Sequence, residues 1–228
     1  MPVGGGDPAA YGLVMTDSSA FAGFPQWGVS FYQQLEVTNT KDFWAQHKAQ
    51  WERDVREPML ALADALEDEF GPARLFRPNR DIRFSNDKSP YKTHQGAFVG
   101  VATGVGYYVQ LSGDGLAVGG GFRAHSPAQT SRYRAGVDAP TSGARLERVT
   151  ADLAAAGFAF EGAALKTRPK GFAADHPRLD LLRRKEIMVL QRLGTPPWLS
   201  TPEVVDHVRA SWRQVRPLVD WMTDHVHE

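Results

Sequence analysis

Three apolar segments near the middle of the chain, separated only by short turns, limit its fold more than any other feature. They read "GAFVGVAT" (96–103), "GYYVQLSG" (106–113) and "GLAVGGGF" (115–122). Thr103-Gly104 and Gly113-Asp114-Gly115 have the residue types of tight turns. Three successive strands with such short connections predict an antiparallel meander. The glycines at 119–121 then indicate a bulge or a close backbone approach rather than a phosphate-binding loop.

Helical patterns precede this sheet. A short amphipathic helix is expected at 27–35, and a longer one from about Thr40 to Phe70, where apolar residues recur at spacings of three and four. Pro58 lies inside the longer pattern and should kink or split it. Two short strands are expected next, within "ARLFRPN" (73–79) and "DIRFS" (81–85).

Helices also follow the sheet. They are expected at 127–137 and 141–157, followed by a strand pair around "FAFEGAALKT" (158–167), a strand at 186–193 and a long helix at 200–226. Ser200 and Glu203 have the spacing of a capping box for that last helix. The prediction is an α+β fold: a central antiparallel sheet flanked by long N-terminal and C-terminal helices. We expect residues 1–19 to be a flexible leader and 20–228 to form a single domain.

The composition excludes several classes of function. The 26 basic residues balance the 26 acidic ones, so an overall basic footprint for nucleic acid is absent. The chain contains no cysteine, which excludes disulfides, thiolate metal sites and a cysteine nucleophile. It has no run of about 18 apolar residues and no signal-peptide pattern, so we expect a soluble cytoplasmic protein without a membrane partner.

One short segment concentrates charge in this neutral chain. "RDIRFSNDKSPYKTH" runs from Arg80 to His94, and the interval 74–92 holds six cations against Asp81 and Asp87, a local net charge of +4. Arginine offers a planar fork of donors suited to carboxylate or phosphate. We expect a strand end followed by a proline-closed turn, with Ile82 and Phe84 anchoring the backbone and the charges facing a common point.

Four segments resemble a known family in chain order: "FPQWGVSFYQQLEVTNTKDFWAQHK", "RDIRFSNDKSPYKTH", "YYVQLSGDGLAVGGGF" and "RPKGFAADHPRLDLLRRK". They are similar to the signature segments of the family catalogued as domain of unknown function 2461, over roughly Phe24 to Met222. The resemblance implies one soluble α+β domain and no particular activity.

The function suggested by these residues is binding of, or action on, a small anionic ligand bearing phosphate or carboxylate. The expected ligand-binding residues are Arg80, Arg83, Lys88, Tyr91, Lys92 and Lys170, and the catalytic candidates are Asp81, Asp87 and His176. His176 can equally cap the helix that follows it. No metal is expected, because the acidic and histidine residues match no ligand spacing. Cofactors, reaction type and oligomeric state stay open.

Two other functions stay open as well. The same charged segment, helped by Lys170 and "RRK" at 183–185, could serve a nucleic-acid binding or processing module. Alternatively the segment is an internal brace of a non-catalytic structural or interaction domain, with its arginines and aspartates paired with each other. The ligand-binding and brace hypotheses differ in whether the charges face a cavity or one another.

Overall fold

The computed structural model describes residues 20–81, 83 and 86–226, and the proposed leader, Ile82 and Phe84 lie outside these residues. An α+β fold is confirmed, with a six-stranded antiparallel sheet in the order β1-β2-β3-β4-β6-β5. The strands are β1 (Ala73–Leu75), β2 (His94–Ala102), β3 (Val105–Ser112), β4 (Gly115–Arg123), β5 (Ala159–Glu161) and β6 (Glu186–Gly194). The expected meander is β2-β3-β4.

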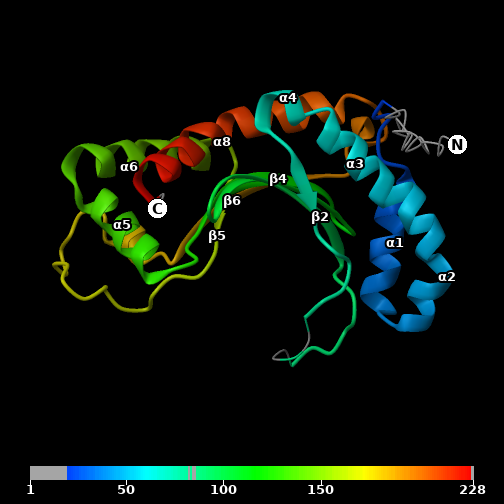
Figure 1. The fold of residues 1–228 in the computed structure, drawn as a ribbon, viewed down its shortest axis with the longest axis horizontal. Helices are drawn as coiled ribbons and strands as arrows, with labels where there is room; N and C mark the ends of the chain where they lie inside the picture. The colour runs from blue at the N-terminus through cyan, green and yellow to red at the C-terminus, as the bar shows by residue number, and fades with distance from the viewer. Residues whose placement is uncertain (1–19, 82, 84–85, 227–228) are drawn as a thin grey trace, which may run out of the picture.

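Helices gather on one face of this sheet and at its two ends (Figure 1). They are α1 (Gln26–Val37), α2 (Lys41–Trp51), α3 (Glu57–Asp64), α4 (Glu67–Phe70), α5 (Pro127–Asp138), α6 (Pro140–Ala155), α7 (Leu179–Leu182) and α8 (Val204–Val226). Along the middle of the sheet the covering helix is α8. Trp212 of α8 donates its indole N–H to the carbonyl of Tyr108 at 3.1 Å, and Gly120 leaves room for Val215.

The opposite face of the sheet is concave, and side chains alternate onto it along each strand. Tyr107 packs against Trp212, so its neighbour Tyr108 points to the concave face, because successive side chains of a strand alternate between faces. The Tyr108 ring lies on Gly96, where a Cβ atom would come within 2.5 Å of the hydroxyl oxygen. Figure 1 shows the loop after β1 and the loop before α7 extending on the side away from α8.

Glycine also lets β4 and β6 approach closely. A Cβ atom on Gly119 would lie 1.8 Å from the Val189 carbonyl oxygen, and Gly121 adopts a φ of 139°. The expectation of a close backbone approach at 119–121 is therefore confirmed, and Gly119 and Gly121 add no side chain to the face of β4 opposite Gly120.

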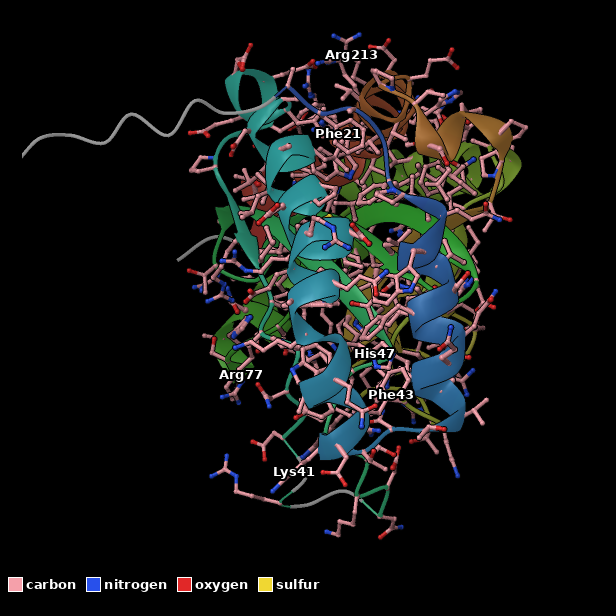
Figure 2. The ribbon with its side chains drawn as sticks, turned by 90° about the vertical axis from the view of Figure 1, so that its right-hand side faces the viewer. Phe21, Lys41, Phe43, His47, Arg77 and Arg213 are labelled. Carbon is pink, nitrogen blue, oxygen red and sulfur yellow. The ribbon has the colours of Figure 1, made fainter. Side chains whose placement is uncertain are left out.

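The long helix expected at 40–70 is broken into α2, α3 and α4. A π-helical turn, Glu52–Arg56, directly precedes Pro58, and the Glu57 N–H bonds to the Glu52 carbonyl five residues earlier. A regular helix would aim the Asp54 carbonyl at the N–H that Pro58 lacks, and the wider turn accommodates this loss. Figure 2 shows Phe43 and His47 projecting from α2 toward α1, where Phe43 stacks on Phe31.

Two local predictions were wrong. The last helix begins at Val204 rather than Ser200, because Ser200 ends a short 3₁₀ turn and the Thr201 hydroxyl accepts the Glu203 N–H at 3.3 Å. A strand at 81–85 is also absent among its described residues, since Arg83 lies in a turn. Within the described part of the chain, no helix combines the length and apolarity needed to cross a bilayer.

Candidate functional site

The charged segment forms a loop that closes on itself at its base. Asn79 pairs with Tyr91 in an isolated antiparallel bridge. The Arg80 N–H donates to the Pro90 carbonyl at 2.9 Å, and the Lys92 N–H donates to the Pro78 carbonyl at 2.8 Å. These bonds hold the two ends of residues 78–92 together as they leave and rejoin the sheet.

Helix α2 and the residue before its cap anchor this loop to the core. Asn39 donates to the Tyr91 carbonyl at 2.9 Å and accepts the Tyr91 N–H at 3.1 Å. The Tyr91 ring stacks on Trp44 with centroids 4.3 Å apart and an interplanar angle of 11°. Tyr91, expected as a ligand donor, is only 9% exposed and lies against the aromatic core of α1 and α2.

Two ion pairs lie within the loop itself. Arg83 reaches Asp81 with two guanidinium nitrogens, at 2.9 and 2.6 Å, and Arg80 pairs with Asp87. Hydrogen bonds from Arg83 lower the pKa of Asp81, and hydrogen bonds from Ser89, then from Arg80, lower the pKa of Asp87. Both carboxylates are therefore stabilised in the charged form, which makes them weak bases.

A second group of cations lies near Phe76, just after β1. We call Arg74, Phe76, Arg77 and Lys92 the Phe76 cluster. The Arg74 guanidinium lies 5.8 Å and the Lys92 ammonium 5.2 Å from the centre of the Phe76 ring. The Lys92 ammonium donates to the Arg77 carbonyl at 2.9 Å, and Figure 2 shows the Arg77 side chain pointing outward from the ribbon.

The cations of the Phe76 cluster differ from Arg80 and Arg83 in having no carboxylate partner among the residues that the structure describes. Burial, and then the charge of Arg77, lower the pKa of Lys92. The charge of Arg77 also acts on Asp81, but the hydrogen bonds of the Asp81 carboxylate come from Arg83. The segment's charge of +4 is thus unevenly distributed. The loop cations Arg80, Arg83 and Lys88 exceed the two aspartates by one, and the other three charges lie at the loop's base.

The second signature segment places His176 in a fixed orientation. Its Nδ1 accepts the Arg178 N–H at 3.0 Å, so its proton lies on Nε2, which donates to Asp138 at 3.0 Å. Arg178 in turn donates to the carbonyls of Val137 and Asp138. These contacts join the α7 segment to the end of α5, whereas Lys170 is exposed on the preceding loop.

A polar cavity of about 160 Å³ lies on the concave face beside the Phe76 cluster. His94 and Gln110 reach it from β2 and β3, and Arg192 from β6. Its remaining lining residues are Glu36, Thr93, Ser112, Asp114, Gly115, Leu116 and Ala117. Larger cavities lie beside α7 (Arg178 and Arg184) and beside α5 (Arg134 and Lys185). None of these three is lined by a ligand-binding or catalytic candidate predicted from sequence.

Sequence reasoning missed several residues of this region. Arg74 and Arg77 entered the charge count, but nothing in the sequence shows that the aspartates pair with other arginines. Gln110 could have been assigned to the concave face because it lies two residues after Tyr108. Nothing in the sequence indicated that Arg192 lies near this region, since its strand β6 is brought there by pairing with β4. Within the described residues, no group of three or more histidine or acidic side chains could hold a metal.

These features define a class of protein: an α+β domain whose sheet is covered by helices on one face and rimmed by two charged loops on the other. A family model describing conserved hypothetical proteins, DUF2461, matches residues 28–221, and the chain belongs to that family. The family inferred from the sequence is thereby confirmed. No curated protein and no solved structure matches the chain.

Proposed function

We propose that this protein binds a small anionic ligand, bearing phosphate or carboxylate, at the base of the charged segment. The observation that supports the proposal is the Phe76 cluster, where Arg74 and Lys92 lie over one ring and the charge of Arg77 acts on Lys92, with no ion pair to a carboxylate in the described chain. Like charges held together repel one another, and an anion placed among them removes that repulsion.

The arrangement also suits the chemistry of such a ligand. Guanidinium groups provide paired donors for phosphate or carboxylate oxygens, and an ammonium adds a compact charge. Lys92 is held by the Arg77 carbonyl and by the Phe76 ring, so its position is set before a ligand arrives. Pre-positioned donors lose less conformational entropy on binding.

The proposed ligand class is the one inferred from the sequence. The proposed site moves from the Arg80–Lys92 segment as a whole to the Phe76 cluster at its base. Lys92 remains a proposed ligand-binding residue. Arg80 and Arg83 are assigned a different role, which is to close the loop through Asp87 and Asp81. In the described part of the chain no contact of Tyr91 or Lys170 favours a ligand role, and the proposal assigns none to Lys88 and no catalytic role to the acidic candidates.

Calorimetric titration with inorganic phosphate tests the proposal, with thermal unfolding as a second readout. A ligand at 100 times its dissociation constant adds about 2.7 kcal/mol to the free energy of unfolding. We expect Lys92→Met and Arg77→Met to weaken phosphate binding at least tenfold. Arg145→Met is the matched control, because Arg145 is a surface arginine of α6 that pairs with Asp224.

Arg83→Met locates the site within the segment. We expect it to leave phosphate affinity unchanged, because Arg83 lies in the loop rather than in the Phe76 cluster. Loss of binding in Arg83→Met with retention in Lys92→Met would place the ligand at the loop instead. Absence of phosphate binding, or equal loss in Arg145→Met, would overturn the proposal. An extended nucleic-acid site predicts a steep loss of oligonucleotide affinity with salt, which the same calorimeter can measure.

A further inference from the structure

The polar cavity on the concave face is physically joined to the Phe76 cluster. The ring of Tyr108 lies 6.0 Å from the Phe76 ring, and its hydroxyl donates to the Gln110 side chain at 2.9 Å. Gln110 lines the cavity, and so do Thr93 and His94, which directly follow Lys92. A ligand whose anionic group lay at the Phe76 cluster would therefore have its remaining atoms next to this cavity.

The cavity wall presents hydrogen-bonding groups that the protein does not use. Within the described part of the chain, the ring nitrogens of His94, the carboxylates of Glu36 and Asp114, and the amide nitrogen of Gln110 have no hydrogen-bond or ion-pair partner. Burial, followed by the charge of Lys92, lowers the pKa of His94, which favours the neutral imidazole. A neutral imidazole offers one donor and one acceptor, as a hydroxyl group does.

The charges around the cavity restrict what it can hold. Glu36 and Asp114 oppose a second anion. Arg192 is paired with Glu161, so the charge that opposes a cation is that of the nearby Lys92. An apolar group would leave the unused donors and acceptors dehydrated, which is costly. The volume of about 160 Å³ equals the liquid volume of roughly five waters. A short uncharged polyol, or much of one sugar ring, meets all three conditions.

We infer that the ligand is a sugar phosphate or a similar polyol ester, with its hydroxyl groups in the cavity lined by His94, Gln110 and Asp114 and its phosphate at the Phe76 cluster. This inference rests on the proposed function, because it needs the anionic group to be held there. It adds a second subsite and a substrate class that the cluster alone does not specify.

Four probes separate the two subsites by calorimetry: inorganic phosphate, ribose 5-phosphate, ribose and phosphoethanolamine. We expect ribose 5-phosphate to bind about tenfold more tightly than inorganic phosphate, which corresponds to one or two net hydrogen bonds. Phosphoethanolamine tests the ammonium that Glu36 and Asp114 could attract. It should bind no more tightly than phosphate, and ribose alone should bind weakly.

Two variants test the location. Asp114→Ala removes a carboxylate that makes no side-chain bond within the described protein, and Gln110→Met replaces an amide with an apolar chain of similar length. Each should remove most of the tenfold gain while leaving the affinity for inorganic phosphate intact. Arg145→Met should change neither. Circular dichroism of Gln110→Met checks that the loss of the Tyr108 bond leaves the fold unchanged.

The outcomes distinguish this inference from the proposed function. Lys92-dependent phosphate binding without a gain for ribose 5-phosphate overturns the inference alone. A gain that survives both Asp114→Ala and Gln110→Met overturns the location, and tighter binding of phosphoethanolamine than of ribose 5-phosphate overturns the sugar assignment. If neither phosphate nor its esters bind, the proposed function falls as well.

Discussion

Replacing Asn39 by alanine tests whether α2 and its flanking residue hold the charged loop in place. The substitution removes two hydrogen bonds, from the Asn39 amide to the Tyr91 carbonyl at 2.9 Å and from the Tyr91 N–H to Asn39 at 3.1 Å. A net contribution of about 0.5–1.5 kcal/mol per bond gives about 1–3 kcal/mol for the pair. If the loop base opens as one unit, its opening equilibrium should rise by about 5- to 140-fold.

Amide hydrogen exchange measures this opening at the bonds that close the loop. The N–H groups of Arg80 and Lys92 bond across the loop base, so both should exchange faster by the same factor in Asn39→Ala. Asn39→Asp keeps an acceptor for the Tyr91 N–H and loses only the donor, so it should give an intermediate rate. Unchanged exchange at Arg80 and Lys92 would refute the reasoning, because the loop would then be held by its own bonds.

The remaining predictions concern stability. Hydrogen bonds from Arg213, and also from Arg216, lower the pKa of Glu69 to about 2. Its folded pKa is therefore below the unfolded one, so its stabilisation is complete above the ordinary carboxyl range and lost as pH falls from about 4.5 toward 2. Glu69→Gln should melt below the native protein near neutral pH and converge with it in acid, and parallel melting curves at every pH would contradict this. Gly119→Ala should lower the free energy of unfolding by roughly 1–3 kcal/mol or more in urea, because its Cβ would lie 1.8 Å from the Val189 carbonyl oxygen. Gly100→Ala, whose Cβ has its nearest contact at 3.4 Å, is the control and should cost less. Tyr32→Phe should cost about 1–3 kcal/mol, since it removes the buried acceptor of the Trp51 indole N–H, and an unchanged urea midpoint would exclude that role.

The sheet was predictable because its information is local. Each strand of β2-β3-β4 alternates or runs apolar between turn residues, so neighbouring segments of sequence determine both strands and connections. That Tyr107 and Tyr108 face opposite sides of the sheet also follows from the two-residue period. The position of the helix break near Pro58 was predicted, but the π-helical turn that forms it was not. A proline removes one regular backbone hydrogen bond of the helix without specifying which wider turn replaces it.

The candidate site was only partly predictable because its charges are resolved by tertiary contacts. The count of six cations and two anions in 74–92 is a property of the sequence. Whether Asp81 pairs with Arg83 or with Arg77 depends on the turn geometry, and the position of Arg192 depends on the pairing of β4 with β6. Sequence separation hides Arg192, and the spacing of charges does not show which nearby arginine Asp81 takes, so the sequence alone could not divide the segment into two parts.

The division of the segment into a paired loop and an unpaired cluster makes the brace hypothesis compatible with the proposed anion site. A brace requires that opposite charges meet, and Asp81 and Asp87 meet Arg83 and Arg80 in a loop whose base is pinned at Tyr91. An anion site requires that like charges be held together without compensation, which costs free energy unless other contacts fix them. The closed loop supplies those contacts: it returns Lys92 to the Phe76 ring and to the Arg77 carbonyl. On this argument the brace keeps the cations of the Phe76 cluster close enough to bind the proposed anion, so loosening the loop at Asn39 should weaken phosphate binding without touching a proposed ligand-contacting residue.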